Sequence, residues 1–308
     1  MDQDKSTGLK ENRFRLFVKT LRAAFKGFQD NDPLRLAGAT AFFATFALPP
    51  ILIILTQTLG FVFEPKDINE RLSEHLRSFF GKESVVMIMQ TLEGFRDLAV
   101  NWYIAIGGFI FLLFVATTLF KIIRESINQL WHIKSQRGKN VPQQLMPRLK
   151  SMAIILLTGL LFIAGLLAEA VQAVLNPYIR GLWSNAGSAV VIILNQIISL
   201  IIVTIWFSVL FRLLPEGKPR WKVAITGGLF TGVLFTIGKL VLGSMLAISK
   251  IQNIYGAAGS LVLVLLFVFY VSFIFYYGAM FTYYWAENTG NGIHPGKFGK
   301  SIEPIGKL

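Results

Sequence analysis

The sequence predicts an all-α, polytopic membrane protein with six transmembrane helices, a kinked or broken first span and additional interfacial amphipathic helices. Two observations lead to this fold class, and a third limits the chemistry of the chain. The chain of 308 residues is 54% hydrophobic and only 15% charged, with a mean hydropathy of +0.57, which lies outside the range of soluble domains. Several apolar runs are long enough to cross a bilayer, which takes about 20 residues. Cysteine is absent, which excludes a disulfide framework and thiolate chemistry.

The first predicted span, residues 36–63, carries no charge and contains Pro49 and Pro50 near its middle. The two prolines remove two backbone donors and disfavour a helical conformation at Leu48. We therefore expect the helix to be kinked or split at this point. Carbonyl groups freed inside hydrocarbon need partners, so this point should face protein or a water-filled cavity. Pro49 is accordingly a candidate for a functional midplane.

The remaining apolar runs predict the other five spans, at about residues 102–123, 152–175, 189–211, 223–246 and 258–285. With six spans, the segments on the side of the N-terminus hold 22 of the 30 lysines and arginines, and the opposite segments hold seven. The positive-inside rule then predicts that both termini are cytoplasmic. The mixed-charge segment 64–101 is expected to form two short helices outside the membrane.

The N-terminal segment predicts a basic amphipathic helix over residues 13–28, too polar to span the membrane. Its apolar positions recur at spacings of three and four: Phe14, Phe17, Val18, Leu21, Phe25 and Phe28. Basic residues fall between them, and we expect these to bind the membrane surface: Arg13, Arg15, Lys19, Arg22 and Lys26. Such a helix should lie among the anionic head groups of one leaflet, and a helix that binds a partner protein is the alternative.

The chain is therefore predicted to have three parts. Residues 1–33 form the cytoplasmic basic helix, residues 34–286 the six-helix transmembrane domain, and residues 287–308 a cytoplasmic tail. Asp32 and Pro33 supply a helix N-cap and a first helical position where the first span begins.

The charge and the motifs of the chain exclude several classes of function. The net charge of +13 would suit a nucleic-acid-binding protein, but the clustering of lysine and arginine in the predicted cytoplasmic segments has a simpler cause in membrane topology, so no nucleic-acid partner is expected. The three histidines lie in separate segments, and no zinc, hydrolase or nucleotide-binding motif occurs. We therefore expect no enzyme activity, no catalytic residues, no metal site and no cofactor.

Ionisable groups inside predicted spans are the strongest candidates for function, because burying each costs about 2.5–3.5 kcal/mol on insertion scales. Glu169 and Lys239 lie 19 and 17 residues after the nearest cytoplasmic lysine, so both are roughly 25–28 Å from the inner surface. They could form an ion pair that lines a cavity. Alternatively, Lys239 extends to the outer head groups and Glu169 lies at the interface. The predicted substrate path consists of Pro49, Pro50, Glu169, Lys239 and Asn195.

Other notable residues have structural explanations. Arg124, Glu125 and Asn128 precede Trp131 at the cytoplasmic end of the second span, which fits a salt bridge at a helix end beside an aromatic anchor. Glycines in the last two spans favour close helix packing over a pore. They are Gly227, Gly228, Gly232, Gly238, Gly256, Gly259 and Gly278.

The chain resembles the YihY/BrkB family of bacterial inner-membrane proteins, once labelled ribonuclease BN. The resemblance covers nearly the whole chain and rests on four stretches: LRLAGATAFFATFALPPILI, SINQLWHI, LLPEGKPRWKVAITGGLFTGVLFTIGK and YGAAGSLVLVLLFVFYVSFIFYYGAMFT. Two positions depart from it, because Phe42-Phe43 stands where the family commonly has Tyr-Tyr, and Met280 follows Gly278-Ala279 where the family has glutamate. A mechanism that depends on that acid is therefore in doubt here.

The resemblance implies six transmembrane helices, location in the bacterial inner membrane and a role at the envelope, with lipid transport suspected in some relatives. Our leading hypothesis is a translocator of a lipid or lipid-linked amphiphile, with the phospholipid bilayer and anionic head groups as partners. The first alternative is a non-transporting envelope scaffold. An ion-coupled small-solute transporter is a second, with Glu169 as its titrating acid, and a nuclease is a remote third because no catalytic cluster supports it.

Overall fold

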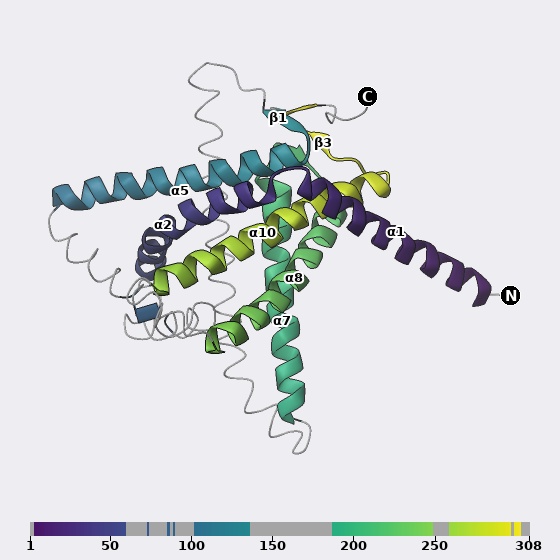
Figure 1. Ribbon diagram of the computed structural model, residues 1–308, viewed down its shortest axis with the longest axis horizontal. Coiled ribbons are helices and arrows are strands. Elements are labelled where there is room, and N and C mark those ends of the chain that lie inside the picture. Colours follow the sequence, from purple (N-terminus) through teal and green to yellow (C-terminus); the bar gives the residue numbers. More distant parts are fainter. Residues whose placement is uncertain are drawn as a thin grey trace. The chain divides into compact units, whose positions relative to one another are not determined.

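The computed structural model describes residues 3–59, 102–135, 187–248, 259–296 and 299–302, together with positions 73, 85, 86 and 89. Helices dominate these residues (Figure 1). They are α1 (Gln3–Gln29), α2 (Pro33–Leu59), α5 (Trp102–Leu130), α7 (Gly187–Leu213), α8 (Trp221–Ile248) and α10 (Gly259–Asn288). The predominantly helical fold is thereby confirmed, whereas Glu169, the third span and most of the segment 64–101 lie outside the described residues.

Three segments of the described helices are long and apolar enough to cross a membrane: Ile193–Leu213, Trp221–Val241 and Val262–Asn288. They correspond to the predicted fourth, fifth and sixth spans. Exposed apolar side chains follow two of them at every fourth position, which is the spacing of one helix face. These are Ile193, Ile197, Ile201 and Ile205 on α7, and Ile225, Leu229, Val233 and Ile237 on α8. Such stripes suit contact with lipid chains; the count of six spans stays a prediction.

Helix α2 continues through Pro49 and Pro50 to Leu59, so the helix is not split at the prolines. Pro33 begins α2, as predicted. A short turn joins α1 to α2, in which Asp32 has a left-handed backbone with a φ of 52°. The side-chain amide of Asn31 donates to the Gly27 carbonyl at 2.8 Å, which satisfies an acceptor at the end of α1. A kink in the first span stays a prediction.

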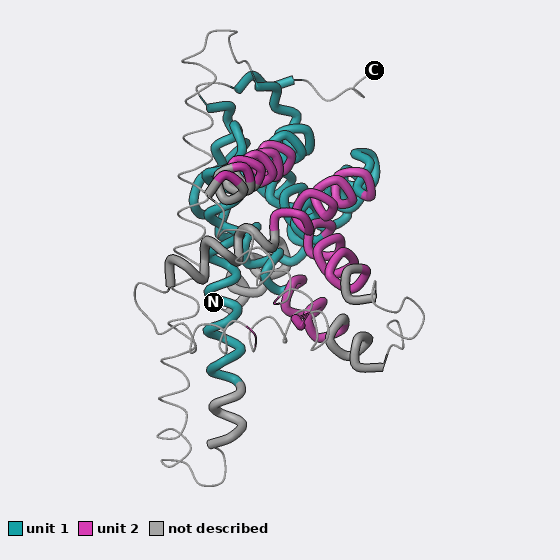
Figure 2. The backbone as a smooth tube through the Cα atoms, turned by 90° about the vertical axis from the view of Figure 1, so that its left-hand side faces the viewer, with its two compact units in different colours: residues 1–33, 124–233, 274–308 teal, residues 34–123, 234–273 magenta. Residues whose placement is uncertain are grey.

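The chain divides into two compact units (Figure 2). Unit 1 comprises residues 1–33, 124–233 and 274–308, and unit 2 comprises residues 34–123 and 234–273. In unit 2, α2 and α5 pack through Ala47, Val115 and Leu119. The predicted boundaries at residues 33 and 286 stay predictions, because these units reflect packing and not position in a membrane.

Helices α8 and α10 interlock in unit 1 through two reciprocal pairs of glycine and threonine. A Cβ atom on Gly227 would collide with the Thr282 hydroxyl, and one on Gly278 would collide with the Thr231 hydroxyl. Each threonine hydroxyl donates to the glycine carbonyl one turn earlier on its own helix, at 2.7 Å in both cases. The pairs therefore set an antiparallel register, with the two backbones as close as small residues allow.

Short strands join the ends of the helices in unit 1. Strand β1 (Ile133–Ser135) pairs antiparallel with β4 (Gly299–Ser301), and β2 (Gly217–Lys218) pairs antiparallel with β3 (His294–Pro295). Backbone hydrogen bonds extend this network, because Gly296 donates to Glu216 at 2.8 Å and Ile302 donates to His132 at 2.7 Å. The chain after α10 is thus paired with two loops between helices.

Trp131 lies at the centre of this network and is only 2% exposed. Its indole N–H donates to the Ala279 carbonyl of α10 at 2.8 Å. Gly217 lies against its ring, where a Cβ atom would come within 2.7 Å. The Asn128 side-chain carbonyl accepts from the Glu216 backbone N–H at 2.8 Å. Trp131, expected to be an aromatic anchor at the end of the second span, is therefore buried within unit 1, where Gly217 and α10 cover it.

We expect the stability of the protein to fall as the pH drops below about 6.5, through His132. Its ring meets that of Tyr283 edge to face at 5.7 Å, and burial lowers the pKa of the imidazole from its usual 6.5 because the charged form loses hydration. The unfolded chain therefore binds the proton more tightly, and this destabilisation begins at the unfolded pKa and levels off below the folded one. Melting temperatures between pH 8 and pH 5 measure the slope.

The test variant is His132→Asn, because asparagine tolerates the left-handed backbone at this position, where φ is 52°. It should flatten the dependence of the melting temperature on pH. The matched control is His294→Asn on β3, whose side chain is exposed, and it should keep the wild-type slope. An unchanged slope in His132→Asn would contradict the assignment.

Candidate functional site

Helix α1 packs along α10 through one face. Thr20, Ala24 and Phe28 are buried, at spacings of four residues. The Asn288 side-chain amide donates to the Thr20 hydroxyl at 2.9 Å, and the Phe17 ring meets that of Phe281 at 5.6 Å. Helix α1 is therefore an integral part of unit 1.

This packing revises which side of α1 is available to lipid. In the predicted apolar face, Phe28 is now buried against Tyr277, with ring centroids 5.5 Å apart, and Phe17 is 36% exposed. Phe14 and Phe25 keep exposures of 69% and 52%. The buried face runs through Thr20 and Ala24, so the helix is turned from the orientation that its phenylalanines alone suggest.

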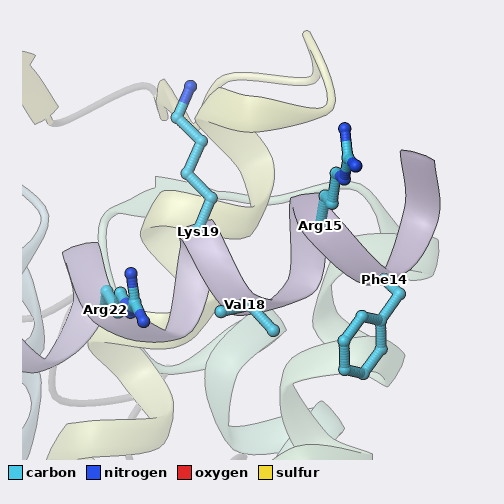
Figure 3. A pocket seen from close by; sticks show the side chains of 5 residues that line it. All are labelled: Phe14, Arg15, Val18, Lys19 and Arg22. Atoms are coloured by element: carbon cyan, nitrogen blue, oxygen red, sulfur yellow. The ribbon is translucent and has the colours of Figure 1, made fainter. Parts of the chain in front are cut away.

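A second face of α1 carries cations at the same spacing. Arg15, Lys19, Arg22 and Lys26 are all exposed and follow one another at intervals of four, three and four residues. The first three surround a hollow of about 340 Å³ that is also lined by Phe14 and Val18. Figure 3 shows the side chains of Lys19 and Arg15 directed to one side of the helix and those of Phe14 and Val18 to the other. The hollow thus combines apolar and cationic walls.

Two residues of the predicted substrate path are described with their side chains. Lys239 is partly buried on α8 within the candidate span Trp221–Val241, and Asn195 is partly buried on α7. Next to Lys239, Gly238 lies directly against the Tyr270 ring, and the Tyr270 hydroxyl donates to the Leu234 carbonyl at 3.2 Å. Asn195 belongs to unit 1 and Lys239 to unit 2, so each is described in its own unit.

The other predicted path residues are less fully described. Pro49 and Pro50 lie within α2, and Glu169 lies outside the described residues, so the pairing of Glu169 with Lys239 stays a prediction. Arg13 belongs to α1, ahead of the described side chains of that helix. Within the part of the chain that the structure describes, no group of three or more histidine, aspartate or glutamate residues could hold a metal ion.

Comparison with known proteins bears on the whole chain. The sequence profile of the family described as Virulence factor BrkB matches residues 24–298. The protein belongs to the BrkB family. This confirms the resemblance derived from the four sequence stretches. The match includes residues 24–29 at the end of α1 and strand β3 after α10, and it ends just before β4.

The relatives of this BrkB-family protein are described as UPF0761 membrane proteins. One from Saccharophagus degradans is 24% identical over 267 residues, which cover 85% of this chain and 58% of the relative. One from Stenotrophomonas maltophilia is 22% identical, covering 79% of this chain and 55% of the relative. One from Aggregatibacter aphrophilus is 23% identical, covering 78% and 82% respectively. No solved structure matches the chain.

The first two relatives extend well beyond the matched part, so the chain spans little more than half of their length. Together with the apolar helices, their descriptions establish that this BrkB-family protein is a membrane protein. They name no substrate, partner or reaction.

Sequence reasoning missed two parts of the site. The buried face of α1 was missed because threonine and alanine give a weaker apolar signal than the six apolar residues beside them. A signal was nevertheless present, because Thr20, Ala24 and Gly27 recur at helical spacing and small residues mark close helix contacts. The pairing of the tail strands had no such signal, because strands of two or three residues show no periodicity.

Proposed function

We propose that this BrkB-family protein moves an anionic lipid or lipid-linked amphiphile across the membrane through its helix bundle. The observation that supports the proposal is Lys239, a cation on an apolar helix segment that has the length of a membrane span. An ionisable group at such a position is expensive and marks a functional site by default. It lies beside the tight contact of Gly238 with Tyr270, which fixes the backbone that carries it.

The charges along α8 fit this role. Lys222 is exposed in the first turn of the helix, 17 residues before Lys239. At 1.5 Å per residue, the two cations are about 25 Å apart along one helix axis. A phosphate-bearing head group would therefore meet a positive charge near each end of the apolar segment, where the hydrocarbon core of a bilayer is about 30 Å thick.

A scaffold without transport is the second candidate, and the exposed cationic face of α1 favours it. Deleting residues 13–28 would not test the scaffold function cleanly. Thr20 and Phe28 belong to the packing of unit 1, and their loss would destabilise the bundle. Substitutions of exposed residues separate the two functions more cleanly.

We expect Lys239→Met to slow protein-dependent movement of a fluorescent phosphatidylglycerol between the leaflets of proteoliposomes by about tenfold or more, since a hydrogen bond to a charged group contributes about 1.5–3 kcal/mol. Lys239→Arg should retain most of the rate because it keeps the charge. Glu169→Gln should also slow movement if Glu169 and Lys239 act together.

The matched control is Leu240→Met, a change at an exposed apolar position next to Lys239 on α8. It should move lipid at the wild-type rate. Wild-type rates in a well-folded Lys239→Met variant would remove Lys239 from the path and favour the scaffold.

A further inference from the structure

We infer that α1 carries a binding surface for the phosphate of an anionic membrane lipid, formed by Arg15, Lys19 and Arg22 around the hollow that Phe14 and Val18 also line. The inference concerns equilibrium binding at one helix. It does not rest on translocation, because a scaffold and a transporter could both use such a surface.

Helix α1 is strongly basic. Residues 13–28 contain five lysines and arginines and no aspartate or glutamate. The side chains of Arg15, Lys19 and Arg22 are exposed, and their spacing of four and three residues puts them on one helix face, so their positive potentials add over the hollow. Arginine offers several N–H donors in a planar fork, and lysine adds a point charge, which together suit the oxygens of a phosphate diester.

The apolar part of the hollow selects an amphiphile. Phe14 is 69% exposed and lies one helical turn before Val18 on the wall of the same hollow of about 340 Å³. A free phosphate has nothing to bury against these side chains. A lipid places its phosphate against the cations while its glycerol and first methylene groups cover the phenyl ring, which removes apolar surface from water.

The attachment of α1 keeps this surface near the bilayer. The helix contacts Tyr277, Phe281 and Asn288, which all belong to the candidate span Val262–Asn288 of α10. It also continues into α2 through residues 30–32 alone. A basic helix fixed to the candidate span of α10 meets lipid head groups before it meets a soluble polyanion.

The packing of α1 also prepares the surface for binding. Thr20, Ala24 and Phe28 are buried against unit 1, so the helix that carries the cations is already ordered and oriented. Binding then avoids the entropic penalty that an isolated amphipathic helix meets when it folds on a membrane.

The test measures binding of dioleoylphosphatidylglycerol to the full chain in neutral detergent micelles, with dioleoylphosphatidylcholine as the uncharged comparison. The test variant is Lys19→Gln/Arg22→Gln, which leaves Arg15 and every buried residue of α1 in place. The matched control is Lys134→Gln/Lys300→Gln, two exposed lysines that face each other on β1 and β4. Both variants lower the net charge by two.

An exposed ion pair changes affinity by up to about fivefold, so the test variant should bind phosphatidylglycerol up to about 25-fold more weakly than the wild type. The control variant should stay within about twofold of the wild type, and phosphatidylcholine binding should not change in either. Equal losses in the two variants would show a non-specific effect of net charge and overturn the inference, as would wild-type affinity in the test variant.

A second variant, Phe14→Ala, tests the lipid character of the ligand without touching a charge. It should weaken phosphatidylglycerol binding, and soluble glycerol phosphate should not compete with the lipid. Full competition by glycerol phosphate would show a site for a free phosphate. Tighter binding of single-stranded RNA than of lipid, with the same loss in Lys19→Gln/Arg22→Gln, would show a nucleic-acid surface, and either result would overturn the assignment to lipid.

Discussion

Replacing Gly227 with leucine is expected to destabilise the protein by about 3 kcal/mol, because the new side chain has no space at the contact between α8 and α10. A Cβ atom at this position already collides with the Thr282 hydroxyl. Leucine favours helix formation by about 1 kcal/mol over glycine. Any loss of stability is therefore caused by the contact between the helices and not by the local backbone. The melting temperature in detergent measures the effect.

The control for this substitution is Gly38→Leu on α2, where a Cβ atom would have no heavy atom within 4 Å. It should leave the melting temperature unchanged or raise it. Combining Gly227→Ala with Thr282→Ala should restore part of the stability that Gly227→Ala loses, because the hydroxyl that collides is removed. Equal melting temperatures for the wild type and Gly227→Leu would contradict the interlock.

Trp131→Ala is expected to destabilise the protein by about 3–5 kcal/mol, the range for removing a large buried aromatic side chain. The variant opens a cavity among the short strands and removes the indole donor to the Ala279 carbonyl. Trp131→Phe keeps most of the volume and should cost about 1–3 kcal/mol, mainly for the lost hydrogen bond. Thermal or denaturant unfolding in detergent compares the variants.

Trp221→Ala is the matched control, because Trp221 is 50% exposed and its ring lies 5.8 Å from the Arg212 guanidinium. Its loss should amount to about 0.5–1 kcal/mol, the strength of an exposed cation–π contact. If Trp131→Ala were as mild as Trp221→Ala, the buried position of Trp131 would be contradicted.

The helices could be predicted because each long apolar run indicates a membrane span from its own residues alone. Charge-poor segments of span length appear in the sequence wherever α7, α8 and α10 have their candidate spans. The basic face of α1 could be predicted equally well, because Arg15, Lys19 and Arg22 recur at helical spacing. Pro49 and Pro50 predicted a kink or a split, and α2 is not split because a helix can continue through residues that lack a backbone N–H.

The contacts between helices could not be predicted in the same way. The glycines of α8 and α10 indicated close packing, but the register that joins Gly227 to Thr282 and Gly278 to Thr231 depends on both helices at once. Trp131 was predicted to be an aromatic anchor because its position at a helix end is typical of one. Gly217, which lies against its ring, and Ala279, which accepts from its indole, are both far from it in sequence.

Movement of a fluorescent phosphatidylglycerol between the leaflets of proteoliposomes that contain the wild-type chain is the most direct test of translocation. We expect exchange that scales with the amount of folded protein, that is absent in protein-free vesicles and that is slower for phosphatidylcholine. Exchange no faster than in protein-free vesicles, from protein with the wild-type melting temperature, would contradict translocation and leave the protein as a membrane scaffold.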